Sequence, residues 1–437
     1  MKEKNLFIKS TLILICSGFL TKILGFIIKI AYTRIIGEYG ISLYTIATPT
    51  YSLLLTIATL AIPISISKLV SENKGRSIRI LTSATVLILI INFILIIIIF
   101  LTHDFIANTL LKNSLASPIL IAFSLTLPFV SISSVIKGYF AGKQNMVPHA
   151  TSNIIEQIVR LIIIVIALPK LMKISTMAAV IGLILLTIIS EISSIIVFLF
   201  FIPKKINFNT NIKPSIPITK DILDISLPTV SSRIIGNIGY FFEPIILTNL
   251  LLLKGYSSSY ILEEYGAYNA YSLALLTAPG FFIASIATSL LPEISKYYGE
   301  KNIKMVKRRI HQALLFAFSI GFISSFLIYT FRDKILFALY NTTTGSDYIK
   351  ILAPFFVLFY LEGVLTSSLQ ALGKAKKSMN ITLWGVIIKL IVLTILSLCK
   401  IGIYSLVFAE IINILFVVLI STKTLKSTIK ESHYRLS

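Results

Sequence analysis

The chain has 437 residues, of which 56% are hydrophobic and 13% are charged, and its formal net charge at pH 7 is +22. This composition excludes a soluble globular protein, because a water-exposed surface needs far more charged residues than this chain carries. The basic residues lie between hydrophobic segments rather than in one patch. Their distribution therefore argues against a nucleic-acid-binding face and indicates the topology of a polytopic membrane protein.

Apolar segments long enough to cross a bilayer follow one another along the chain, and "LTSATVLILIINFILIIIIF" (81–100) is an example. The first 20 residues have a basic start and an apolar run but no small-residue cleavage site, so we interpret them as part of the first membrane helix. The sequence predicts an all-α membrane protein with about twelve transmembrane helices. They lie at 10–35, 41–67, 80–102, 117–138, 150–168, 177–202, 222–250, 266–294, 310–331, 349–371, 378–399 and 402–421.

The distribution of Lys and Arg predicts the orientation of these spans. With the N-terminus in the cytoplasm, most basic residues fall in cytoplasmic segments, and the loop 296–312 contributes the most. The opposite orientation would violate the positive-inside rule. We therefore expect a multi-pass protein of the bacterial plasma membrane with both termini in the cytoplasm.

A polar stretch near the middle of the chain, residues 203–221, contains three prolines and has no helical periodicity. It predicts a linker between two groups of six spans. The expected domains are an N-terminal lobe at 1–203, a cytoplasmic linker at 204–221 and a C-terminal lobe at 222–437 that ends in a basic tail.

The two halves of the chain contain short matching stretches in the same order, which indicates an internal repeat. The matches are 57–68 with 286–296, 21–25 with 232–236, 141–144 with 372–375, and 190–200 with 409–419. Because six is an even number of spans, both repeats begin on the same side of the membrane. We expect a pseudo-two-fold axis along the membrane normal, with substrate bound where the lobes meet.

Cations inside the spans define the candidate substrate site. The repeat pairs Lys22 with Arg233 and Arg160 with Lys389, and each lies about 15 to 18 Å deep along its helix, near the middle of the bilayer. Lys29 lies two turns beyond Lys22 on nearly the same helix face. Charges at this depth are costly, so these five residues are predicted to bind an anionic substrate in a central cavity.

Carboxylates on the same helices leave an alternative open. Glu156 and Arg160 lie four residues apart and would also form a purely structural ion pair between helices. Glu243 and Glu362 are further candidates, either as supporting partners of the cations or as groups that bind a coupling ion.

Prolines in the second and eighth spans are candidate helix hinges beside the cavity. The alternative is that proline is simply common in membrane helices. The four residues are Pro49, Pro63, Pro279 and Pro292.

Four longer stretches carry a specific resemblance. "TPTYSLLLTIATLAIPISISKLVSE" (48–72), "IKGYFAGKQNMVPHATSNIIEQIVRL" (136–161), "GYFFEPIILTNLL" (239–251) and "LTAPGFFIASIATSLLPEISKYYGE" (276–300) resemble the SpoVB branch of the multidrug/oligosaccharidyl-lipid/polysaccharide exporter superfamily. That superfamily also contains the lipid II flippase MurJ and the MATE drug exporters.

The resemblance implies two six-helix lobes and alternating access. It also implies a flippase that moves an undecaprenyl-diphosphate-linked cell-wall precursor, lipid II or a related polysaccharide unit, from the inner to the outer leaflet. Peptidoglycan synthesis or sporulation would be its setting. Lys22 stands where MurJ-type flippases place an arginine, whereas the second such arginine position falls on Ile28, with Lys29 beside it.

Other classes of protein remain as alternatives. The main one is a MATE-like, cation-coupled multidrug exporter, and a non-transporting scaffold is another. An enzyme is not expected, because no cluster of Asp and His suited to acid–base or metal chemistry is present in the sequence. We expect no cofactor or metal and no nucleotide-binding loop, so the driving force would be membrane potential, H⁺ or Na⁺. We also expect a monomer.

Overall fold

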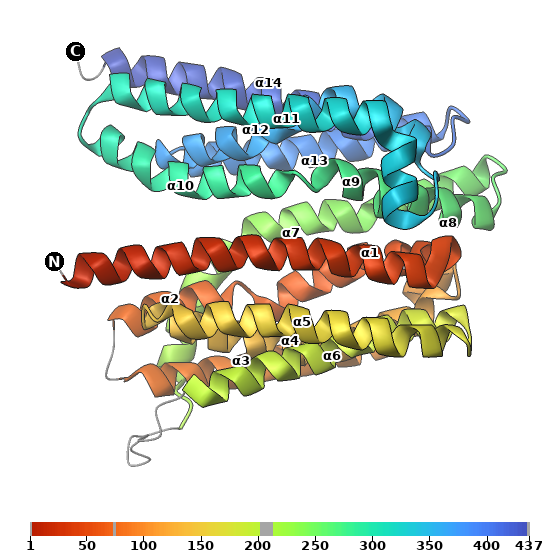
Figure 1. Ribbon diagram of the computed structural model, residues 1–437, viewed down its shortest axis with the longest axis horizontal. Coiled ribbons are helices and arrows are strands. Elements are labelled where there is room, and N and C mark those ends of the chain that lie inside the picture. Colours follow the sequence, from red (N-terminus) through yellow and green to blue (C-terminus); the bar gives the residue numbers. More distant parts are fainter. Residues whose placement is uncertain (1, 73–75, 202–212, 435–437) are drawn as a thin grey trace. The chain divides into compact units, whose positions relative to one another are not determined.

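The computed structural model describes residues 2–72, 76–201 and 213–434. Within these ranges the chain forms α-helices and two short π-helical segments, and no strand (Figure 1). The predicted all-α class is confirmed. The first half contains α1 (Lys2–Thr59), α2 (Ile62–Glu72), α3 (Ser77–Asp104), η2 (Phe105–Leu110), α4 (Ala116–Gly142), α5 (Met146–Met172), α6 (Thr176–Phe201) and α7 (Ile216–Leu253). The second half contains α8 (Ser258–Gly266), η3 (Ala267–Leu273), α9 (Ala274–Thr277), α10 (Gly280–Gly299), α11 (Ile303–Tyr340), α12 (Ser346–Ala371), α13 (Ala375–Ser397) and α14 (Tyr404–Tyr434).

The helices divide into two compact units, Met1–Phe241 and Phe242–Ser437. The division falls inside α7, so the first part of this helix packs with the first unit. Residues 202–212, which make up much of the expected linker, lie outside the described residues. The lobe limits expected from the sequence stay a prediction.

Nine helices in the described ranges are long and apolar enough to span a membrane, or ten if the bent stretch from Ser258 to Gly299 counts as one span. The sequence predicted about twelve. The predicted span 41–67 and most of the predicted span 10–35 fall within the single stretch Ser17–Glu72, and α5 is not among the nine. These spans establish a multi-pass membrane protein.

Polar side chains stabilise the break between α1 and α2 in the first unit. Leu60 and Ala61 adopt left-handed backbone angles there, with φ of 48° and 51°. The carbonyl of Ala58 accepts hydrogen bonds from Asn92 Nδ2 at 3.3 Å and from Ser131 Oγ at 3.4 Å. A helix end inside a membrane needs such partners, because no water is present to replace them.

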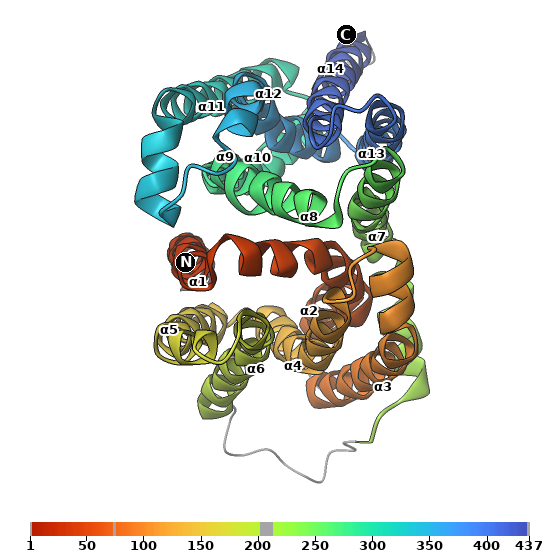
Figure 2. The same ribbon diagram turned by 90° about the vertical axis from the view of Figure 1, so that its right-hand side faces the viewer.

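Within the first unit, α5 packs against α1 and α6, and α4 packs against α2, α3 and α6 (Figure 2). Small residues permit these close contacts, as is usual between membrane helices. A Cβ atom on Gly138 of α4 would lie 2.6 Å from the carbonyl oxygen of Pro63, and one on Gly142 would lie 2.7 Å from that of Ser67. The two glycines therefore set how closely α4 approaches α2.

Within the second unit, α12 packs against α10, α11 and α14, and α13 packs against α14. Gly321 of α11 lets the ring of Tyr360 on α12 approach, because an added Cβ would lie 2.8 Å from that ring. A bend of 51° separates the segment ending at Thr277 from α10. This unit is thus built around α12.

Candidate functional site

Arg160 forms the centre of a buried ion-pair cluster in the first unit. Its Nη2 atom lies 3.2 Å from Glu156 Oε1, one turn earlier on α5, and 3.5 Å from Glu191 Oε1 on α6. Its Nε atom donates a hydrogen bond to Ser190 Oγ at 3.0 Å. Both glutamate side chains are only 7% exposed. Two buried carboxylates need two cations to balance their charge, and Arg160 supplies one of them.

Lys137 of α4 is that second cation. Its Nζ atom lies 3.0 Å from Glu156 Oε2, so Glu156 joins Lys137 to Arg160. Two cations and two carboxylates make the cluster formally neutral. The sequence analysis did not identify Lys137, although its place just inside the end of the predicted span 117–138 was a usable signal.

A cavity of about 260 Å³ in the first unit brings together two of the predicted substrate-binding residues, Lys29 and Arg160. Its walls come from α1, α5 and α6, and no carboxylate is among the described residues that line it. The cavity is smaller than most ligand pockets, which measure roughly 300–1,000 Å³. It therefore suits one small anionic group. The lining residues are Gly25, Ile28, Lys29, Tyr32, Tyr44, Gln157, Arg160, Ile164, Leu183 and Thr187.

Two other predicted cations lie elsewhere in the first unit. Lys22 on α1 and Arg233 on α7 are both exposed, and neither lines the cavity of Lys29 and Arg160. Arg233 falls in the first unit, although the sequence analysis assigned it to the second repeat. The ring of four cations stays a prediction.

Lys389 of α13 forms the corresponding cluster in the second unit. Its Nζ atom lies 2.5 Å from Glu243 Oε2 on α7 and 2.6 Å from Glu410 Oε2 on α14. The Lys389, Glu243 and Glu410 side chains are 16%, 2% and 12% exposed. The sequence repeat relates Arg160 to Lys389 and Glu191 to Glu410. In the structure, Arg160 forms an ion pair with Glu191 in the first unit, and Lys389 forms one with Glu410 in the second.

The two clusters differ in charge. Glu362 of α12 is half-buried, and in the described part of the chain its Oε1 atom is buried without a hydrogen-bond partner. Lys389 contacts two carboxyl groups, those of Glu243 and Glu410, and Glu362 is a third carboxyl group of the second unit. The first unit has balanced charges and the additional Lys29. In formal charge, the first cluster is thus neutral and the second is negative.

The four candidate hinge prolines fall into two groups. Pro63 is the second residue of α2, directly after the break at Leu60 and Ala61, and Pro279 is the N-cap of α10 at the 51° bend. Pro49 and Pro292 lie inside α1 and α10. Two of the four therefore coincide with interruptions of a helix, which is where a hinge motion would need them.

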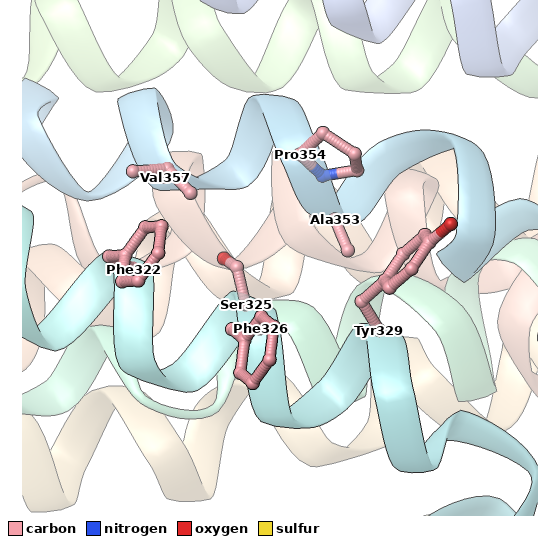
Figure 3. Close-up of a pocket in the computed structure, with 7 residues that line it drawn as sticks. All are labelled: Phe322, Ser325, Phe326, Tyr329, Ala353, Pro354 and Val357. Carbon is pink, nitrogen blue, oxygen red and sulfur yellow. The ribbon is translucent and has the colours of Figure 1, made fainter.

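The second unit also has an apolar pocket of about 190 Å³ between α11 and α12 (Figure 3). Phe322, Phe326 and Tyr329 of α11 line it together with Pro354 and Val357 of α12. Without a charged group among its lining residues, this pocket suits a hydrocarbon chain rather than a charged headgroup. Ala353 and Ser325 complete its lining.

Each of the two helical units of this multi-pass membrane protein thus holds a buried cation between carboxylates. The fold is similar to a solved structure described as the inward-facing conformation of a multidrug resistance MATE family transporter of the MOP superfamily. The two share 15% identity and a TM-score of 0.76, and the match covers 95% of this chain and 96% of the other. The fold is therefore similar to that of this MATE family transporter.

The chain belongs to the polysaccharide biosynthesis protein family, whose model matches residues 7–298. A MatE model matches residues 244–396. The chain is 32% identical to the stage V sporulation protein B of Bacillus subtilis (strain 168), with 99% of this chain and 87% of that protein covered. It is 24% identical to the lipid II flippase MurJ of the same organism, with 88% of this chain and 76% of that protein covered.

Proposed function

We propose that this protein is a flippase for an undecaprenyl-diphosphate-linked cell-wall precursor, lipid II or a related polysaccharide unit. The observation that carries the proposal is the cavity of the first unit, where Lys29 and Arg160 lie together and no carboxylate is among the described lining residues. Two similar proteins support it by name, the sporulation protein and the lipid II flippase of Bacillus subtilis.

The chemistry of a diphosphate matches this cavity. The planar guanidinium of Arg160 suits two oxygens of one phosphate, and the ammonium of Lys29 adds a second positive charge. Without such groups, an unpaired diphosphate inside the membrane would lose its hydration without compensation. Glu156 holds Arg160 in position while the cavity is empty. The polyprenyl tail stays in lipid, so only the headgroup needs a polar path.

In this proposal the second unit couples substrate transport to the movement of a proton or Na⁺. Lys389 neutralises only part of the charge of Glu243, Glu410 and Glu362, so the cluster takes up a proton or Na⁺ as the transport cycle proceeds. We place the protein in a bacterial plasma membrane with both termini in the cytoplasm. The substrate then moves outward, from the leaflet where precursors are made to the leaflet where they are used.

Lipid II translocation in proteoliposomes tests the proposal. We expect Arg160→Ala to lower the rate about tenfold to a hundredfold, because a charge-assisted hydrogen bond contributes roughly 1.5–3 kcal/mol. Lys389→Ala is expected to lower it as well, through the loss of coupling and through destabilisation of the second unit, so its rate is measured only on protein that inserts and folds. Arg160→Lys retains the charge and should recover part of the rate. Lys173→Ala is the matched control, because Lys173 is exposed at the C-terminal end of the same helix.

The outcomes are distinct. An unchanged rate in Arg160→Ala, in a variant that inserts and folds, would reduce Arg160 to a structural partner of Glu156 and Glu191. A wild-type protein that moves no lipid II would exclude lipid II, and the same assay with other lipid-linked oligosaccharides would then decide whether any flippase activity exists.

A MATE-like exporter is the second candidate, and the carboxyl-rich cluster of the second unit favours it. Exporters of organic cations attract their substrates with carboxylates, and Glu243 and Glu362 would serve this purpose. The MatE model matches residues 244–396, which include Glu362 and Lys389 but not Glu243 or Glu410. Uptake of organic cations into inverted vesicles, driven by a proton or Na⁺ gradient, would identify this function, and its absence together with glycolipid flipping would exclude it.

A further inference from the structure

A second and larger cavity of the first unit lies at the ends of α2, α4 and α5. Its volume is about 580 Å³, within the usual range for ligand sites. The predicted topology places this end of the helices at the cytoplasmic side. The residues that line the cavity are Pro63, Ile64, Ser67, Lys68, Ser71, Lys137, Gly138, Ala141, Gln144 and His149.

The lining groups are suited to an anion. Lys68 and Lys137 supply two positive charges, and no carboxylate is among the lining residues that the structure describes. The Nδ2 atom of Asn153 lies 3.4 Å from Nδ1 of His149. When that amide donates to Nδ1, the ring proton of His149 is on Nε2, where it is another hydrogen-bond donor.

The corresponding region of the second unit has a different charge pattern. The repeat relates Lys68 to Lys296, which lies 4.0 Å from Glu300 in an exposed ion pair. Nearby on α10, Glu293 forms an ion pair of 2.8 Å with Arg309. Carboxylates thus neutralise both of these cations in the second unit. In the first unit Glu156 pairs with Lys137 from outside the cavity lining, and no carboxylate is among the described residues that line the cavity beside Lys68.

Two close backbone contacts fix the walls of this cavity. Gly138 of α4 lies against Pro63 of α2, and Gly142 lies against Ser67 and Val70, so an added Cβ would collide in each case. The cavity is therefore preorganised, which lowers the cost of ordering a ligand within it.

Lys137 connects this cavity with the Arg160 cluster. It lines the cavity, and its Nζ atom lies 3.0 Å from Glu156, which in turn contacts Arg160 at 3.2 Å. An anion in the cavity competes with Glu156 for Lys137. Its arrival therefore changes the electrostatic environment of Arg160, although Arg160 lines the other cavity.

We propose that the cavity of Lys68, Lys137 and His149 is a diphosphate-binding site at the cytoplasmic end of the first unit, which the lipid-linked substrate occupies before it reaches Arg160. This inference rests on the proposed function for the identity of the substrate. The anion site itself rests on the cavity, its cations and its contact with Glu156.

Binding measurements in detergent test the site with two probes, inorganic pyrophosphate and undecaprenyl diphosphate. We expect Lys68→Gln to weaken the binding of both about tenfold, because it removes one charge-assisted contact. Lys143→Gln is the matched control, since Lys143 is also exposed but contacts the ring of Tyr139 rather than lining the cavity. It should bind both probes like the wild type. His149→Gln is a second variant that leaves both lysines in place.

Equal affinities of wild type and both lining variants for the two probes would overturn the proposal. A loss of affinity for pyrophosphate alone would overturn the assignment to the lipid substrate. Flipping assays separate this inference from the proposed function. If wild type moves glycolipid and Lys68→Gln moves it equally fast at low substrate, the site is wrong and the function stands. If Lys68→Gln loses affinity for both probes but wild type moves no glycolipid, the function is wrong and the site stands.

Discussion

Arg160 and Lys389 show how one repeated position acquires two different environments. Each is a cation on the fifth helix of its repeat, and each contacts a glutamate of the sixth, Glu191 or Glu410. The second carboxylate of Arg160 comes from its own helix, whereas that of Lys389 comes from α7. Among the residues that the structure describes, a second cation, Lys137, joins the cluster of Arg160, and the ion pairs of the other cluster involve Lys389 alone. These differences make one cluster neutral and the other acidic.

Removal of the Lys389 charge should strongly destabilise the second unit. Lys389→Met leaves Glu243 and Glu410 close together and without their cation, and breaking a buried pair costs roughly 3–5 kcal/mol. We expect a clearly lower melting temperature in detergent. Lys389→Arg should retain most of the stability, and Glu243→Gln combined with Lys389→Met should recover part of it.

Lys296→Met is the matched control for this prediction. Lys296 and Glu300 form a surface pair with side chains 69% and 52% exposed, so its removal should change stability by less than about 1 kcal/mol. A similar melting temperature for Lys389→Met and Lys296→Met would contradict a structural role for the buried cluster.

At the scale of a single element, Gly37 divides α1 into two parts. Its φ of 75° and ψ of −179° place it in a region of backbone angles that is essentially restricted to glycine. An added Cβ would meet no atom within 4 Å, so the requirement for glycine comes from the backbone and not from packing. One residue thereby ends the first predicted span and begins the second.

Gly37→Ala should therefore lower stability by roughly 1–3 kcal/mol, through backbone strain alone. Gly18→Ala on the same helix is the control. Gly18 is also free of neighbours within 4 Å but has no positive φ, so alanine there should be neutral or stabilising by up to about 1 kcal/mol. Melting of both variants in detergent measures the difference. Equal stability would show that the kink is not required.

At the scale of the whole molecule, the two cysteines offer a test of the membrane topology. Cys399 is exposed and is the last residue of the predicted span 378–399, on the side predicted to be opposite to the termini. A membrane-impermeant maleimide should label Cys399 in intact cells that carry Cys16→Ser. In a cysteine-free background, Ser427→Cys on α14 should be labelled only after the membrane is permeabilised. The reverse pattern would invert the predicted orientation.

The sequence by itself determined the helical membrane class, because the length and apolarity of a span are properties of a contiguous segment. It also related Arg160 to Lys389 and placed Glu191 opposite Glu410, since a repeat preserves positions along the chain. From the sequence, Glu243 was a candidate either for a partner of a buried cation or for a group that binds a coupling ion. The structure shows it in an ion pair with Lys389.

Only the tertiary structure decided which side chains meet. Lys137 was missed because its partner Glu156 lies 19 residues away on another helix, and the angle between helices is not a property of either segment. The cavity of Lys68 and His149 was missed for the same reason. Conversely, Lys22 shares a predicted depth with Arg160 but is exposed, because depth along a helix does not fix the direction in which a side chain points. Burial and ion pairing depend on helix packing, which the glycines at 138, 142 and 321 set through contacts between segments distant in the sequence.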